Sequence, residues 1–140
     1  RRFAAPIDLV FDTLTQAAHQ QQWMEAAGMK LVSSSVDLRP GGTSRHVYRR
    51  PSGRLLEVRG LYERVDAPRG YTYIESYDFS PLQIQVTVEL TPAGTETQFR
   101  QTLLYATRAE RDADMEGVVT SSLEAFERLD SYLSTLPGTR

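Results

Sequence analysis

Few side chains of this sequence are of the types that do chemistry, and Glu75 is the most informative of them. It lies in a strand predicted over residues 71–77, where successive side chains point to opposite faces, so it shares a face with Tyr73 and Tyr77. A carboxylate enclosed by apolar groups must be paired, hydrogen-bonded or protonated, because burying an isolated charge is very costly. Two interpretations stay open: Glu75 is a rim residue bonded to a tyrosine or an arginine, or it is a ligand anchor or acid–base group.

Histidine supplies the other candidate for acid–base chemistry, and the sequence has only two. Strand alternation places His46 on the same face as Ser44 and Tyr48, where it is either a hydrogen-bonded wall residue or a catalytic group. His19 is expected on a solvated face of a short helix. A metal site would need ligands from His46, Glu75 and distant residues without any recognisable spacing, so no metal site is predicted.

Motifs for other kinds of chemistry are absent from the sequence. Without cysteine, the chain has no disulfide, no thiol nucleophile and no cysteine-based metal site. Gly41-Gly42 lacks the further glycines and the lysine of a phosphate-binding loop, and no Gly-x-Ser-x-Gly or Ser-x-x-Lys element is present. No cofactor is therefore expected.

Length and composition indicate one domain over residues 1–140, with 40% hydrophobic residues to form its core. The net charge is −2, the isoelectric point is about 5.7 and the arginines are interleaved with acids. Neither nucleic acid nor an anionic membrane is therefore an expected partner. No signal peptide or long apolar run is visible, which favours a cytoplasmic protein. The abrupt start at Arg1-Arg2 leaves open whether residues precede it.

A long helix, predicted from about Thr107 to Leu136, must position the candidate residues. Thr107 and Glu110 have the spacing of a capping box, and Pro137-Gly138 ends the helical pattern. Apolar residues recur mostly at steps of three and four along the side expected to face a sheet. They are Met115, Val118, Val119, Phe126, Leu129, Leu133 and Leu136.

Small residues interrupt the apolar side in the first half of this helix, at Gly117, Ser121, Ser122 and Ala125. Gly117 destabilises a helix interior by about 1 kcal/mol relative to alanine, which favours a packing reason for its presence. Because larger side chains fill the second half, we expect a cavity beneath the first half.

Upstream of the long helix, hydrophobic residues alternate as they do in strands. A short strand near residues 1–4 precedes two short helices, the first after Pro6 and the second over residues 17–24, which carries Trp23. Further strands are predicted over residues 30–38, 43–50, 55–65, 71–77, 84–90 and 96–104, separated by turn sequences. Six to seven strands with short connections indicate a curved antiparallel sheet and an α+β fold.

Several stretches of the chain, taken together, are similar to a known family. They are Phe3-Ala4-Ala5-Pro6, Trp23, Asp37-Leu38-Arg39-Pro40-Gly41-Gly42, Gly60-Leu61-Tyr62-Glu63, Tyr73-Ile74-Glu75-Ser76-Tyr77, Val86-Thr87-Val88 and Gly94-Thr95-Glu96-Thr97. With these landmarks the chain resembles the SRPBCC or START-like helix-grip superfamily, and within it the bacterial Hsp90 ATPase activator homologue-like group, also grouped with polyketide cyclase-like proteins. Met24 stands where the family often has a second tryptophan. The resemblance implies a seven-stranded sheet that grips a long C-terminal helix around an apolar cavity.

The implied cavity leads to the predicted function, which is the binding of a small, mainly hydrophobic ligand. Its predicted lining residues are Trp23, His46, Tyr48, Tyr62, Tyr73, Glu75, Gln101, Gly117 and Ser121. Two alternatives stay open: a cyclase-like enzyme acting on a polyketide or aromatic substrate, and an interaction protein that activates the Hsp90 chaperone ATPase. The chaperone partner ranks last, because that activity in similar proteins involves additional regions. A homodimer is also left open.

Overall fold

A computed structural model describes residues 1–25 and 28–137, apart from the side chain of Glu116. The elements in chain order are β1 (Arg2–Phe3), α1 (Ile7–Thr15), α2 (Ala17–Trp23), β2 (Lys30–Val36), β3 (Thr43–Arg49), β4 (Leu55–Asp66), β5 (Gly70–Tyr77), β6 (Gln83–Ala93), β7 (Glu96–Tyr105) and α3 (Arg108–Leu133). The predicted order of strands and helices is confirmed, with boundaries that shift by a few residues.

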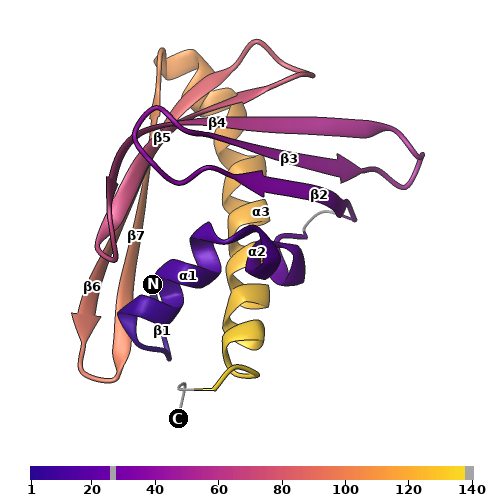
Figure 1. Cartoon of the computed structure of the whole chain (residues 1–140). Helices are drawn as coiled ribbons and strands as arrows, with labels where there is room; N and C mark the ends of the chain where they lie inside the picture. Colours follow the sequence, from indigo (N-terminus) through magenta and orange to yellow (C-terminus); the bar gives the residue numbers. More distant parts are fainter. Residues whose placement is uncertain (26–27, 138–140) are drawn as a thin grey trace.

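The strands of the described residues form one seven-stranded antiparallel sheet in the order β1-β7-β6-β5-β4-β3-β2. Figure 1 shows the sheet bending around α3, from β6 and β7 along one side to β3 and β2 across the top. Helix α2 packs against α3 and β2, and α1 packs against α2 and the strands β6 and β7. The α+β helix-grip architecture is therefore confirmed.

Two side-chain bonds join the short helices to their surroundings. The indole Nε1 of Trp23 donates a 2.8 Å hydrogen bond to the carbonyl of Thr13, which fixes α2 against α1. Nδ1 of His19 lies 2.7 Å from the hydroxyl of Tyr132, which joins α2 to α3. The expectation that His19 lies on a solvated face is therefore wrong: the residue is partly buried because α3 packs against this side of α2.

Three phenylalanines pack together where the two ends of the chain meet the sheet. The ring centroids of Phe3 and Phe99 are 5.5 Å apart, and those of Phe99 and Phe126 are 4.8 Å apart, both in edge-to-face arrangements. Next to them, Leu129 and Leu133 have exposed fractions of 0% and 2%. The C-terminal half of α3 is therefore firmly anchored in the core.

The N-terminal half of α3 packs differently from the prediction. Its start is as expected, because Thr107 Oγ1 accepts a 3.1 Å hydrogen bond from the backbone N–H of Glu110. However, Met115 and Val119 were expected to face the sheet and are instead 42% and 47% exposed. Each residue turns the helix by about 100°, so the side facing the sheet is the neighbouring one, which carries Val118. At the C-terminal end, Gly138 lies outside the described residues.

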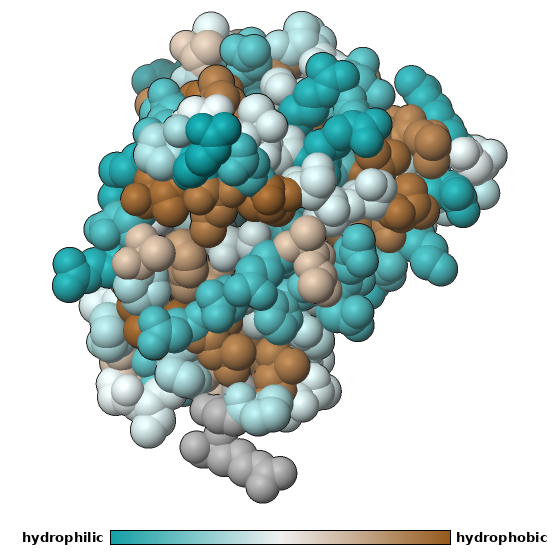
Figure 2. All heavy atoms as spheres, viewed as in Figure 1, coloured by the Kyte–Doolittle hydropathy of each residue, from teal (hydrophilic) through white to brown (hydrophobic). Residues whose placement is uncertain are grey.

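Charged residues occupy the convex face of the sheet. Glu57 on β4 forms ion pairs with Arg45 on β3 and with Arg59 on its own strand, as strand alternation predicts. Figure 2 shows hydrophilic side chains spread over the viewed face of the molecule, with smaller hydrophobic areas between them. The charged groups on the convex face leave the concave face free for apolar residues.

Candidate functional site

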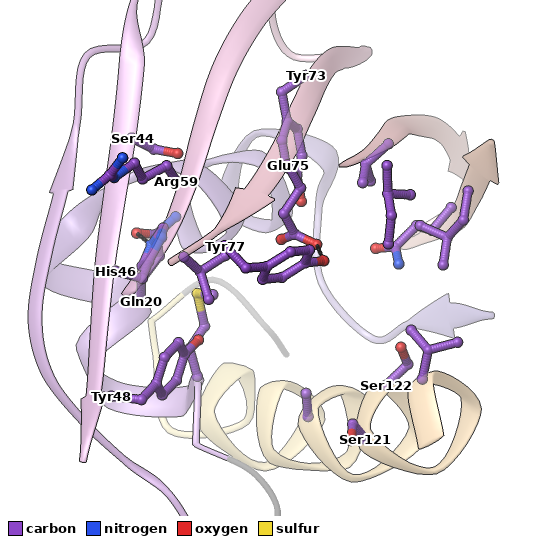
Figure 3. A pocket seen from close by; sticks show the side chains of 18 of the residues that line it. Gln20, Ser44, His46, Tyr48, Arg59, Tyr73, Glu75, Tyr77, Ser121 and Ser122 are labelled. Atoms are coloured by element: carbon purple, nitrogen blue, oxygen red, sulfur yellow. Dashed lines mark hydrogen bonds between the residues drawn. The ribbon is translucent and has the colours of Figure 1, made fainter. Parts of the chain in front are cut away.

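A cavity of about 350 Å³ lies between the concave face of the sheet and the middle of α3. Ile84 and Val86 of β6 form part of its apolar wall, and both are almost fully buried. On the other side, α3 contributes Val118, Ser121 and Ser122. Figure 3 shows these two serines on the helix, across the cavity from Glu75 and Tyr77 of β5. The volume falls in the range typical of pockets for small molecules.

Eight of the nine predicted site residues surround this cavity. They are Trp23, His46, Tyr48, Tyr62, Tyr73, Glu75, Gln101 and Ser121. Gly117 is the exception: it is exposed on α3, and a Cβ built there meets no atom within 4 Å. Its prediction as a lining residue is corrected, because Gly117 lies on the side of the helix that faces away from the sheet.

The pairing of strands explains how Glu75 and Tyr73 come to face the cavity. Glu75 lies opposite Gly60 of β4 and Ile84 of β6, while Tyr73 lies opposite Tyr62 of β4. A Cβ at Gly60 would come within 2.4 Å of Ser44 Oγ and 3.3 Å of Tyr73 Cδ2. The missing side chain at Gly60 thus makes room for the Tyr73 ring on the concave face.

Glu75 is the acidic group of the cavity wall. The hydroxyl of Tyr77 donates a 2.5 Å hydrogen bond to Glu75 Oε2. Burial raises the pKa of Glu75, the Tyr77 hydrogen bond lowers it, and the nearby charge of Asp114 raises it further. The net shift of the pKa is upward, because desolvation outweighs the hydrogen bond from Tyr77. Glu75 can therefore act as a hydrogen-bond donor when protonated and as an anion when not.

Tyrosine rings form the centre of the concave wall. The ring centroid of Tyr73 lies 5.8 Å from that of Tyr62 and 5.9 Å from that of Tyr71. Burial raises the pKa of Tyr62 to about 12 and raises the pKa values of Tyr48, Tyr71 and Tyr73 as well. All four hydroxyls are therefore neutral at pH 7.

A second polar group of the wall is His46, which is held by a residue that sequence reasoning missed. The buried Gln20 of α2 donates from Nε2 to the carbonyl of Leu14, so its Oε1 is an acceptor. That oxygen lies 2.8 Å from His46 Nε2 and also accepts a hydrogen bond from Ser34. His46 Nε2 must therefore carry a proton. Because burial lowers the pKa of His46 to about 4, the ring is neutral at pH 7 and its Nδ1 is an acceptor.

Gln20 could have been found from its spacing. It precedes Trp23 by three residues on a helix, so the two side chains lie on one face, and Trp23 was already assigned to the cavity. A buried amide next to a wall histidine is then a predictable hydrogen-bond partner. Asp114, which accepts a 2.5 Å hydrogen bond from the hydroxyl of Tyr105, was also missed, because it lies outside the predicted apolar side of the helix.

Two further findings concern residues 1–25 and 28–137. Within these ranges, no group of three or more histidine and acidic residues is arranged to hold a metal ion. Among the same residues, no helix combines the length and the apolar character needed to cross a bilayer.

A family model described as Activator of Hsp90 ATPase homolog 1-like protein matches residues 4–134. The chain therefore belongs to this family, and the resemblance noted in the sequence is confirmed. No curated protein matches the chain.

Solved structures with the same fold come from several bacteria. A crystal structure of a protein from Rhodobacter sphaeroides is 29% identical, with a TM-score of 0.91, over 96% of this chain and 90% of that one. A protein from Nitrosomonas europaea is 21% identical, with a TM-score of 0.87, over 96% and 91%. CalU16 from Micromonospora echinospora is 20% identical, with a TM-score of 0.67, over 96% and 73%. The last two show a shared fold.

Proposed function

We propose that this protein binds a small, mainly hydrophobic molecule in the cavity between the sheet and α3. The observation that carries the proposal is the cavity itself, about 350 Å³ in volume, with tyrosine and aliphatic walls and only a few polar groups. An apolar lining with sparse polar anchors is the usual composition of small-molecule sites. The fold of the family fits this function, because a sheet curved around one helix leaves space that side chains do not fill.

The small side chains of α3 also support the proposal. Ser121, Ser122 and Ala125 line the cavity, whereas one turn further along, Leu129 is fully buried in the core. Close packing of the whole helix would be more stable, because protein interiors normally leave few voids. The loosely packed part of the interface between α3 and the sheet therefore lowers stability, as expected for a site that must accept a ligand.

The test is to fill the cavity from the helix side. A fluorescent hydrophobic dye should bind the folded wild-type protein, and Ser121→Phe should reduce its affinity by at least about tenfold, because the new ring occupies the space between helix and sheet. Affinity is measured by titration, and circular dichroism checks that the variant keeps its fold.

A matched control comes from the same helix. Gly117→Gln adds bulk four residues earlier, at an exposed position outside the cavity lining, so dye affinity should stay within about twofold of wild type. If a folded Ser121→Phe variant bound the dye as well as wild type, the ligand site would lie elsewhere and the proposal would be wrong.

A further inference from the structure

The charges around the cavity are unevenly distributed. Glu75 projects into it, and among the described lining residues Arg59 is the one that carries a permanent positive charge. The Arg59 side chain is 62% exposed, and its Nε donates a 2.7 Å hydrogen bond to Glu57 on the convex face. Its charge is therefore directed away from the cavity and already paired, so it does not neutralise Glu75.

Among the residues that the structure describes, the groups that face Glu75 from the surrounding elements add no positive charge. They are Tyr48 on β3, Tyr73 and Tyr77 on β5, Tyr105 on β7 and the acidic Asp114 on α3. The hydroxyls of Tyr77 and Tyr105 each bond to a carboxylate, at Glu75 and Asp114, with distances of 2.5 Å in both cases. The local field at this end of the cavity is therefore negative whenever either acid is ionised.

Aromatic rings surround the acid. Tyr73 and Tyr77 flank it on the same face of β5, and the ring centroid of Tyr77 lies 5.2 Å from that of Phe79. Aromatic faces attract cations, most strongly where water is excluded. A carboxyl group set among aromatic rings, without a paired cation, is an arrangement that recognises a positively charged group.

We propose that the cavity selects a hydrophobic amine, whose ammonium group pairs with Glu75 while its apolar body lies against Ile84 and Val86. This inference rests on the proposed function and specifies its ligand class. A carboxylic acid of the same shape is disfavoured, because it would bring a second negative charge next to Glu75 with no cation to compensate. A neutral alcohol keeps the apolar contacts but lacks the charge-assisted hydrogen bond.

Folding has already removed much of the water around Glu75, and this makes the amine preference measurable. In a new ion pair, both partners normally lose their hydration, which can cancel the attraction. Here the carboxyl group lies in the cavity wall, bonded to Tyr77 and only partly exposed, before the ligand arrives. Only the ammonium group still has to lose its water, so the pair should contribute net affinity.

The experiment compares three probes that share one ring system: 2-naphthylmethylamine, 2-naphthalenemethanol and 2-naphthoic acid. Isothermal titration calorimetry at pH 7 should give the amine an affinity at least about fivefold higher than the alcohol, with the acid weakest. Glu75→Gln should lower amine affinity to that of the alcohol and change alcohol affinity by no more than about twofold. Glu89→Gln, at an exposed position on β6, serves as the matched control and should change neither.

A pH series on the wild-type protein provides a test that needs no variant. Only the ionised carboxylate pairs with the ammonium group, so amine affinity should rise as the pH increases through the raised pKa of Glu75. Alcohol affinity should stay flat over the same range. A folded Glu75→Gln variant that keeps the amine preference would overturn the inference, and so would a wild-type protein whose amine affinity does not change with pH.

The two proposals fail in different ways. If the alcohol binds but the amine binds no more tightly, the ligand class is wrong while the hydrophobic site stands. If none of the three probes binds and the dye also fails to bind, both proposals are wrong.

Discussion

Tyr77 and Glu75 lie two residues apart on one face of β5, and the Tyr77 hydroxyl donates a 2.5 Å hydrogen bond to Glu75 Oε2. Among the described residues, Tyr77 is the one side chain that donates a hydrogen bond to this carboxyl group. A single neutral donor only partly replaces the water that burial removes. The acid is therefore held in position yet keeps a raised pKa, and this combination has consequences for stability as well as for binding.

The first prediction follows from the raised pKa of Glu75. A carboxyl group with a higher pKa in the folded than in the unfolded state binds more protons when folded, so this residue makes stability fall as the pH rises through that interval. Glu75→Gln removes the titration. The free energy of unfolding of the Glu75→Gln variant, measured by urea denaturation from pH 4 to pH 8, should therefore increase relative to that of wild type as the pH rises. A difference that is constant with pH would show that folding does not raise the pKa of Glu75.

His46 gives the opposite pH dependence. Burial lowers the pKa of His46 from 6.5 to about 4, so between these values the unfolded state binds more protons and stability falls as the pH decreases. Replacing the ring by His46→Gln should remove this loss. The wild-type protein should lose more than about 1 kcal/mol relative to the variant between pH 7 and pH 4, since one pKa unit corresponds to about 1.4 kcal/mol. An NMR titration that gives His46 an ordinary pKa would contradict this.

Leucines on the buried and exposed sides of α3 should respond differently to truncation. Leu129 is fully buried, so Leu129→Ala should lower the free energy of unfolding by about 2–5 kcal/mol. Leu123 lies on the same helix but is 53% exposed, and Leu123→Ala should change stability by less than about 0.5 kcal/mol. Equal losses in urea denaturation would mean that the side of the helix carrying Leu123 is as well packed as the side carrying Leu129.

Gly60 offers a test of how the cavity wall is built. Gly60→Ala should destabilise the protein by about 1–3 kcal/mol, because the added methyl group would lie 2.4 Å from Ser44 Oγ. Adding Ser44→Ala removes that oxygen and leaves the Ser44 Cβ 3.7 Å away, an ordinary contact. The double variant should therefore recover much of the lost stability in thermal melts. Full additivity of the two changes would show that the two side chains do not meet.

Strand alternation predicted the cavity wall well, for a simple geometric reason. Because side chains in a strand repeat every two residues, one inward-facing aromatic at Tyr73 fixes the orientation of Glu75 and Tyr77. The same argument correctly placed His46 and Tyr48 on the concave face. Turn sequences then set the antiparallel order, so most of the fold followed from local patterns.

The helix was harder to predict, because its pattern allows more than one buried side. Met115 and Val119 continue the apolar spacing of Leu129 and Leu133, yet they are exposed. An α-helix has 3.6 residues per turn, so a row of apolar residues spaced by three and four rotates slowly around the helix axis. A row that is buried at one end of the helix can therefore face water at the other. Which side of the helix is buried depends on the position of the sheet, and the sequence of the helix alone does not give that position.

The uneven anchoring of α3 predicts uneven local stability. Backbone amides near Leu129 and Leu133 lie in the closely packed half, whereas those around Ser121 border the cavity. Local opening is easier where fewer buried contacts must break. Hydrogen–deuterium exchange should therefore be faster over residues 112–122 than over residues 125–133. Uniform protection along the helix would contradict this.

Trp23, the chain's single tryptophan, gives the protein an intrinsic optical reporter at its own site. The residue is 5% exposed and borders the cavity, and its indole donates a hydrogen bond to the carbonyl of Thr13. Indole emission depends on the polarity of its surroundings, so replacing cavity water by an apolar molecule should change the wavelength or intensity of the signal. Ligand libraries can therefore be screened on the unlabelled protein, and any response originates from one known position in the fold.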